Sequence, residues 1–347
     1  MTRFWRRNAW WLTRVLLLPV SLLAFAIVSF LLVRSIPGDP VLHVLGPNYT
    51  QEAYDAMQAE LGLDGPLIAQ LGAYLAELAT GSLGTSISTG APVLEEFLAR
   101  LPPTLELATL GLVSTLVVTA VLGYVAVFRP RWLLSRIVVW YARAAGAIPE
   151  YVFAIAGLFV FYTVLGWAPA PVGRIDSSIS TPPTVTGFPL LDAAMSGSWP
   201  AVVSILQHYV LPIVVLVLAN APILLKILIA GLEEGVSAAP TRFRIASGAT
   251  HGAVVASMFR RAAPPVITMS GTLFGYLLGG AVILETLFGF VGVGQYVVAA
   301  VNVNDVIAIQ GFLMAVAALT MIVFLAVDII TMVVDPRRRA GASVEGA

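Results

Sequence analysis

Residues 237–265, SAAPTRFRIASGATHGAVVASMFRRAAPP, lie between two long apolar runs and carry four arginines but no acidic residue. Between membrane spans, such a segment belongs on the cytoplasmic side. In a helix, Arg244, Ser247 and His251 would share one face. Gly248 would sit within the same pattern, where its missing side chain lets another backbone approach. Two interpretations follow: a solvated basic loop that only sets topology, or a short helix that docks into a partner.

The composition is that of an integral membrane protein. The chain has 347 residues, of which 59% are hydrophobic and 11% charged, and its mean hydropathy is +0.91. A soluble domain usually has about a quarter of its residues charged. The net charge is zero, so the charge total gives no indication of a nucleic-acid partner. The lack of cysteine excludes disulfides, thiolate metal sites and cysteine nucleophiles.

Six apolar runs approach or exceed the length of about 20 residues that a helix needs to cross a bilayer core. They predict an all-α integral membrane protein with spans at 15–33, 107–128, 137–165, 209–230, 266–288 and 306–334. The first run is too long for a signal-peptide core, so we interpret it as a retained span. The other segments are a terminus at 1–14, a long segment at 34–106, a basic loop at 237–265 and a tail at 335–347.

The arginines predict the orientation of these spans. They gather before the first run, between the second and third, between the fourth and fifth, and after the sixth, while the other connections hold few. By the positive-inside rule both termini are then cytoplasmic, as an even number of spans requires. Residues 34–106 and 166–208 are expected outside, the second segment mostly irregular with a short helix near 190–195.

The chain lacks the residues of common catalytic and nucleotide-binding motifs. Its single lysine, Lys226, lies in an apolar run, so the Gly-Lys-Ser/Thr loop that binds ATP phosphates cannot exist here. His43, His208 and His251 are scattered and have no metal-ligand spacing. We therefore expect no catalytic set, no metal and no cofactor bound by this chain.

Ionisable residues at membrane depth are rare and usually face a bundle interior or a cavity. Arg143 and Glu150 are seven residues apart and are predicted to share one face of the third span, with a kink at Pro149 between them. That face would line a translocation path. The alternative is that Arg143 snorkels to the cytoplasmic boundary and a local helix break holds Glu150.

Three further polar positions lie in the later spans. Asn220 interrupts the fourth span, and Asp328 in the sixth needs a polar partner. Glu285, near the end of the fifth span, is expected to hold a non-helical segment by accepting backbone hydrogen bonds. The complete set of candidates for the translocation path is Arg143, Pro149, Glu150, Asn220, Glu285 and Asp328.

Several motifs, in order along nearly the whole chain, resemble one family. They are LLVRSIPGDP after the first span, GSLGTSISTGAPVLEEFLARLPPTLELA before the second, AIPEY in the third, then GWAPAPVGR, LGGAVILETLFGFVGVGQ and the terminal VDIITMVVDPRRR. The chain resembles the inner-membrane permease subunit of dipeptide/oligopeptide-type ABC importers, of the B type that pairs with a C-type permease. The resemblance implies a type I permease fold of six transmembrane helices in the cytoplasmic membrane of a bacterium.

The resemblance also implies a role for the basic stretch. Such permeases carry a cytoplasmic coupling helix with a fixed glycine, to which Gly248 in TRFRIASGAT is similar, and this helix docks into an ATPase subunit. The implied coupling residues are Arg242, Arg244, Ser247, Gly248 and His251. The implied partners are the C-type permease, ATPase subunits that bind ATP and Mg, an extracytoplasmic peptide-binding protein and membrane lipid.

Some residues depart from the family pattern. Ser247 stands where a lysine usually precedes the glycine, Ile307 replaces a common proline, and Glu150 replaces a small polar residue. The predicted function is a non-enzymatic permease subunit that passes peptides inward. A nickel or other small-solute permease is the alternative. A secondary transporter, which would usually show a repeated half, and a membrane-embedded enzyme are less favoured.

Overall fold

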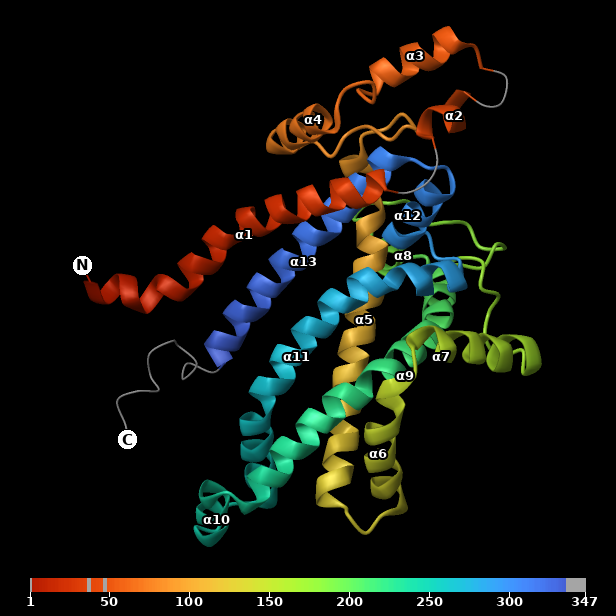
Figure 1. The fold of residues 1–347 in the computed structure, drawn as a ribbon. Coiled ribbons are helices and arrows are strands. Elements are labelled where there is room, and N and C mark those ends of the chain that lie inside the picture. Colours follow the sequence, from red (N-terminus) through yellow and green to blue (C-terminus); the bar gives the residue numbers. More distant parts are fainter. Residues whose placement is uncertain (1, 36–38, 46–48, 335–347) are drawn as a thin grey trace. The chain divides into compact units, whose positions relative to one another are not determined.

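The computed structural model describes residues 2–35, 39–45 and 49–334, so the predicted tail at 335–347 lies outside the described residues. The described chain is helical apart from turns, loops and one isolated β-bridge (Figure 1). Its helices are α1 (Thr2–Arg34), α2 (Pro40–Leu45), α3 (Gln51–Glu60), α4 (Leu67–Ala79), α5 (Val93–Phe128), α6 (Leu133–Ala144), η1 (Ala145–Ala147), α7 (Glu150–Gly157), η2 (Leu158–Val164), α8 (Pro189–Met195), α9 (Trp199–Ser237), α10 (Ala239–Ala246), α11 (His251–Phe288), α12 (Val293–Asn302) and α13 (Val306–Val334).

Five helices of the described chain are long and apolar enough to cross a membrane, and a sixth span results if the bent pair of α6 and α7 counts as one. This confirms the predicted class, an all-α integral membrane protein. Several helices extend beyond the predicted spans. In particular, α11 begins at His251, so most of the predicted loop 237–265 is helical. Thr250 begins this helix by accepting a hydrogen bond from the N–H of Ala253 at 3.4 Å.

The third predicted span, 137–165, is broken rather than kinked. The segments before and after the break are bent by 108°. Pro149 has the extended backbone of an N-cap, and the short 3₁₀ turn η1 precedes it. A proline inside a helix removes one hydrogen bond and its ring clashes with the preceding turn, so the helix ends and restarts here. Arg143 and Glu150 therefore lie on different helices, and the prediction that they share one helix face is wrong.

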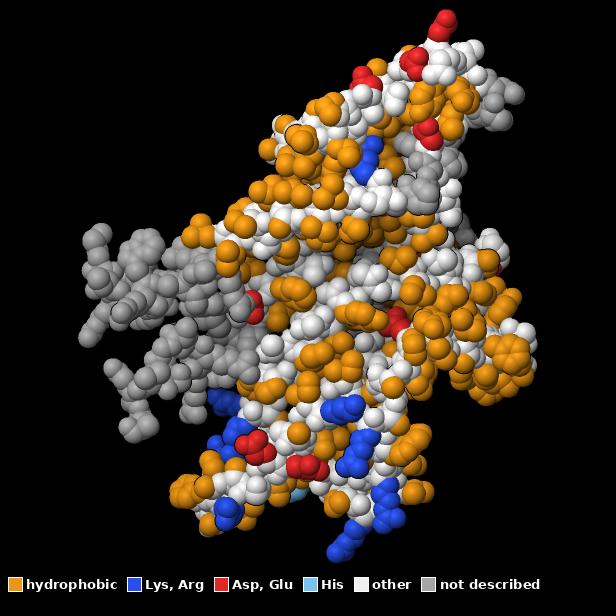
Figure 2. Space-filling model, viewed as in Figure 1, with side chains coloured by type: hydrophobic (Ala, Val, Ile, Leu, Met, Phe, Trp, Pro, Cys, Tyr) orange, Lys and Arg blue, Asp and Glu red, His pale blue; other side chains and the backbone are white. Residues whose placement is uncertain are grey.

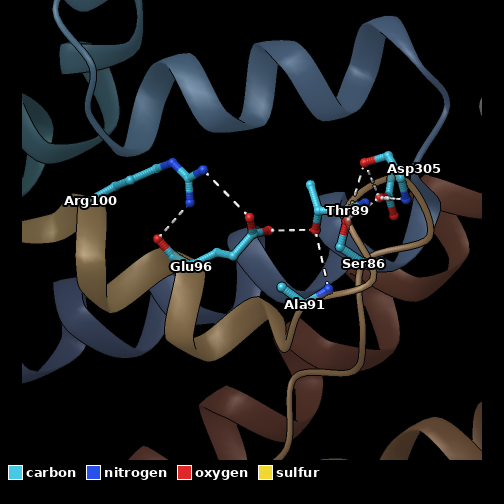
Figure 3. Close-up of polar contacts among 7 residues, drawn as sticks. Ser86, Thr89, Ala91, Glu96, Arg100 and Asp305 are labelled. Carbon is cyan, nitrogen blue, oxygen red and sulfur yellow. Dashed lines mark hydrogen bonds and ion pairs between the residues drawn. The ribbon is translucent and has the colours of Figure 1, made fainter.

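Two compact units make up the chain, the first comprising residues 1–104 and 291–322. In this unit α1 contacts α4 through the rings of Phe30 and Tyr74, whose centroids lie 5.8 Å apart. Glu96 near the start of α5 accepts hydrogen bonds from Thr89 at 3.2 Å and Arg100 at 3.5 Å (Figure 3). The Arg100 guanidinium lies 4.8 Å from the ring centroid of Tyr296 in α12. These contacts join the segment before α5 to α12.

Asp305 fixes the loop before α5 to the start of α13 within the same unit (Figure 3). The side chain is fully buried. Its Oδ2 accepts hydrogen bonds from the Ser86 hydroxyl at 2.7 Å and from the Ser88 N–H and hydroxyl at 2.9 and 2.8 Å. Its Oδ1 accepts one from the Ala308 N–H at 2.9 Å. Burial alone would raise the pKa of Asp305, but these hydrogen bonds outweigh burial and lower it.

The second unit comprises residues 105–290 and 323–347, and α9 is its central helix. Helices α6, α7, α8 and α11 all pack against α9. Small residues allow α5 to approach it closely as well: a Cβ placed on Gly123 would lie 2.6 Å from Leu228. In the connection 166–208, the predicted short helix is present as α8, and Asp192 holds it by accepting hydrogen bonds from Thr186 and Gly187.

Candidate functional site

The short helix α10 is anchored to the helices on either side of it in the second unit. Thr241 is buried, and its hydroxyl donates to the carbonyl of Gly235 at 2.7 Å. Arg261 of α11 donates to the same hydroxyl. The guanidinium of Arg242 donates to the carbonyl of Ser237 at 3.1 and 2.9 Å. A helix of only eight residues is marginal alone, so these bonds fix its position between α9 and α11.

The helices that carry α10 form a packed hairpin. Along it, a buried apolar cluster joins the last turns of α9 to the first turns of α11, and it consists of Leu224, Leu228, Leu232, Val254, Met258, Ala262, Val266 and Leu273. Gly231 permits the close approach, because a Cβ there would lie 3.0 Å from the Cβ of Ala262. Force applied to α10 would therefore be transmitted to two long helices rather than absorbed by a loop.

The outer surface of α10 combines exposed apolar side chains with positive charge. Phe243 is 73% exposed and Ile245 is 60% exposed. The predicted coupling residues Arg242, Arg244, Ser247, Gly248 and His251 are all exposed as well. Figure 2 shows Lys and Arg side chains gathered at the end of the second unit where α6 and α10 lie. Large apolar side chains left exposed on a basic surface are typical of a site that another protein covers.

Sequence reasoning missed Phe243 and Ile245. In TRFRIASGAT, Phe243 lies between Arg242 and Arg244 and Ile245 directly follows Arg244, but no apolar partner for either could be named from the sequence. We therefore group them with the predicted coupling residues, and the predicted coupling surface, called the coupling surface from here on, means Arg242, Phe243, Arg244, Ile245 and the turn at 247–248.

Gly248 lies in a turn and not within a helix, which corrects the prediction. Helix α10 ends at Ala246, and Gly248 follows with a φ of +77°, in the left-handed region. The N–H of Gly248 donates to the carbonyl of Ile245 at 3.0 Å, and that of Ala249 to the carbonyl of Arg244 at 3.0 Å. This is the hydrogen-bond pattern of a Schellman motif. Apart from its chain neighbours, no atom of the described chain lies within 4 Å of a Cβ placed on Gly248, so within this chain the left-handed backbone is the feature that favours glycine.

The predicted helical face of Arg244, Ser247 and His251 is also wrong, for the same reason. His251 is the first residue of α11, and the left-handed turn at Gly248 separates it from α10. Its ring instead contacts the ring of Phe128 at the end of α5, edge to face, with centroids 6.2 Å apart.

A second candidate site is a groove within the second unit, close to the middle of α9 and α11. It has a volume of about 370 Å³. Its lining comprises Gly146, Ala147, Ile148, Pro149, Glu150, Ala219, Asn220, Ile223, Met269, Thr272, Leu273 and Tyr276. The break in the third span thus forms one wall. We call this space the Glu150 groove.

The structure brings together three of the six translocation-path candidates. Pro149, Glu150 and Asn220 all line the Glu150 groove. The Asn220 amide donates to Glu150 Oε2 at 3.5 Å and to the carbonyl of Leu216 at 2.9 Å. The alternative reading of Glu150, that a local helix break holds it, matches its place at the start of α7.

The other three candidates do not line this groove. Arg143 is exposed in the last turn of α6. Glu285 is completely buried in α11, and its backbone carbonyl accepts a hydrogen bond from the Phe290 N–H at 2.7 Å after the helix ends. Asp328 is half-buried in α13. Its neighbour Val327 packs against Gly271 of α11.

Comparisons with known proteins agree with this architecture. Residues 117–340 match the family described as binding-protein-dependent transport system inner membrane component, and residues 8–108 match the N-terminal region of such membrane components. A probable D,D-dipeptide transport system permease protein of Escherichia coli is 34% identical over 96% of this chain and 97% of its own length. A dipeptide transport system permease protein of Alkalihalophilus pseudofirmus is 31% identical over 95% of this chain and 98% of its own length.

A third relative, a di/tripeptide transport system permease protein of Pseudomonas aeruginosa, is 31% identical over 93% of this chain and 96% of its own length. The family match extends over more than half of the chain and includes both α10 and the Glu150 groove. This multi-pass membrane protein therefore belongs to the family of binding-protein-dependent transport system inner membrane components.

Proposed function

We propose that this chain is the permease subunit of an ATP-driven importer that carries peptides inward across the cytoplasmic membrane. The observation that supports it most is the match to peptide permeases over nearly the whole length of both chains. The names of these relatives specify dipeptides or tripeptides, and none of the three specifies nickel, so the nickel alternative is not favoured.

The coupling surface supports the proposal that a separate ATPase subunit drives transport. The chain itself has no Gly-Lys-Ser/Thr loop. Closure of an ATPase pair can move the spans only through a rigid contact, and α10 is held on the α9–α11 hairpin by Thr241 and its partners. We propose that Phe243 and Ile245 enter an apolar cleft of the ATPase, while Arg242 and Arg244 face acidic residues around that cleft.

The proposed complex contains this chain, a C-type permease, ATPase subunits that bind ATP and Mg, and an extracytoplasmic peptide-binding protein. In the proposed orientation α10 and both termini face the cytoplasm. The basic side chains at the α6 and α10 end support it, because positive charge accumulates on cytoplasmic loops (Figure 2).

The test is reconstitution of this chain with a C-type permease, an ATPase and a peptide-binding protein from the same organism. We expect ATP-dependent accumulation of a radiolabelled dipeptide or tripeptide in proteoliposomes, and none when the ATPase is omitted. Accumulation of Ni²⁺ but of no peptide would contradict the proposed cargo. Peptide accumulation driven by an ion gradient without ATPase would contradict the ABC mechanism.

A further inference from the structure

The Glu150 groove is mostly apolar, with a single carboxylate in its wall. Ile148, Ile223, Met269 and Leu273 supply apolar surface. Glu150 is the only acidic residue of the lining, and the lining contains no lysine or arginine. The groove lies near the middle of α9 and α11, both of which are long enough to span a membrane. A carboxylate at such a position is costly and usually marks a path for a substrate or an ion.

Local structure holds Glu150 in place through uncharged groups. It is the first residue of α7, where the partial positive charge of a helix N-terminus stabilises an anion. Asn220, only 4% exposed, donates to the carboxylate at 3.5 Å and is itself fixed by the Leu216 carbonyl. Among the described residues, no basic side chain forms an ion pair with Glu150. The carboxylate therefore has an orienting partner and, within the part of the chain that the structure describes, no ion-pair partner.

The rest of the lining suits a small cation with an apolar body. Tyr276 is 59% exposed, so its ring is available to a ligand, and aromatic rings attract ammonium groups. The exposed Thr272 side chain lies in the same lining. Lys226 lies outside the lining, with its Nζ 3.8 Å from a Cβ placed on Gly146. Positive charge at that edge would attract the anionic part of a ligand.

We propose that Glu150 binds the ammonium group of a peptide in transit, and that the apolar wall and Tyr276 accommodate its side chains. This inference rests on the proposed function, since it assigns a part of the cargo to a part of the path. A peptide can carry an ammonium group in two places, at its α-amino terminus and on a lysine side chain. The α-amino terminus occurs in every unmodified peptide, whereas side chains vary.

The chain has no cysteine, so a single thiol can report on the groove. We would introduce Thr272→Cys into the full complex and measure its rate of alkylation by a small maleimide. The ligands are trialanine, N-acetyl-trialanine and N-acetyl-Ala-Lys-Ala, each at millimolar concentration and without the binding protein. A matched Ser180→Cys variant, exposed in the connection before α8, controls for effects on thiol reactivity in general.

We expect trialanine to slow alkylation of the Thr272→Cys thiol. N-acetyl-trialanine should need a concentration at least about 10-fold higher for the same effect, because it cannot form the charge-assisted hydrogen bond of the ammonium group. Glu150→Gln should remove this difference, and Glu150→Asp should retain part of it. Protection by N-acetyl-Ala-Lys-Ala as strong as that by trialanine would show that a side-chain ammonium suffices. Weak protection would assign the site to the amino terminus.

The inference is overturned if free and acetylated trialanine protect the Thr272→Cys thiol equally, or if none of the peptides protects it. It is also overturned if the difference between free and acetylated trialanine persists in Glu150→Gln. Size-exclusion chromatography of each variant complex shows whether it remains assembled. The comparison of the three peptides in the complex that retains Glu150 tests the inference without any substitution at position 150. Peptide uptake by proteoliposomes separates the two ideas. Uptake without ammonium-dependent protection refutes only this inference, whereas absence of peptide uptake refutes the proposed function.

Discussion

Substitutions at Gly248 should distinguish a backbone requirement from a contact requirement. The residue has a φ of +77°, and no atom lies within 4 Å of a Cβ placed there. Alanine would fit without a clash but would have to adopt a left-handed conformation, which costs about 1–2 kcal/mol. Asparagine tolerates this conformation better, although its side chain is larger. A backbone requirement therefore predicts that Gly248→Asn is milder than Gly248→Ala.

The conformational cost at Gly248 should appear as a lower affinity of the permease for the ATPase. If docking requires the turn that the structure shows, a penalty of 1–2 kcal/mol reduces the preformed fraction, and the apparent affinity for the ATPase falls by a factor of about 5–30. Gly252 is the matched control because it lies in the first turn of α11, also with no atom within 4 Å of its Cβ position. Gly252→Ala should leave the affinity unchanged or slightly improve it, because alanine favours the helix.

The assay is a titration of the purified permease pair with its ATPase, followed by peptide-stimulated ATP hydrolysis. The expected order of affinity is the parent and Gly252→Ala first, then Gly248→Asn, then Gly248→Ala. If Gly248→Asn binds as poorly as Gly248→Ala or worse while Gly252→Ala is normal, side-chain volume at a contact decides the affinity. The backbone argument would then be refuted.

Four further predictions concern stability, pH dependence, orientation and packing. The Asp305 carboxylate accepts hydrogen bonds through two oxygens, and the side chain of Asp305→Asn would have only one. The substitution should therefore destabilise the unit containing the 86–88 loop by about 1–3 kcal/mol; an unchanged melting temperature would refute this. The pKa of Asp305 is lower in the folded protein than in the unfolded chain. Its contribution to the free energy of unfolding is therefore complete above the unfolded pKa and is lost as the pH falls through the folded pKa. Acid should consequently destabilise the parent more than Asp305→Asn. In intact cells, an impermeant thiol reagent should label Ser180→Cys and spare Ser247→Cys, and the reverse pattern would invert the proposed orientation. A Cβ on Gly289 would lie 2.7 Å from the Pro171 carbonyl, so Gly289→Ala should reduce the yield of folded protein after extraction, and a normal yield would count against the observed packing.

The class and the helical spans were predictable because they depend on local properties. Apolar runs of about 20 residues identify membrane helices whatever their neighbours are. The positions of α1, α5, α9, α11 and α13 agree with that reading, although several helices extend further. The motifs along the chain indicated the family that the comparisons show. Arginine placement predicted an orientation, which remains a proposal.

Three features of the sites required the tertiary structure. The sequence indicated a kink at Pro149, but a bend of 108° depends on how α7 packs against α9. It placed Glu150 on the same helix face as Arg143, whereas the break brings Glu150 to Asn220, 70 residues away in the chain. Asp305 meets Ser86 across 219 residues, and no local pattern signals that contact.

The sequence by itself determined the membrane class, the approximate spans, the absence of an ATP-binding loop and the family. It also located the basic stretch that becomes α10. Only the tertiary structure decided that Gly248 ends a helix, that Phe243 and Ile245 remain uncovered, and that Glu150 faces a groove with no basic residue in its lining. The physical reason is that hydrophobic length and charge are properties of single segments, whereas backbone angles at helix ends and the partners of a buried carboxylate depend on distant residues that packing brings together.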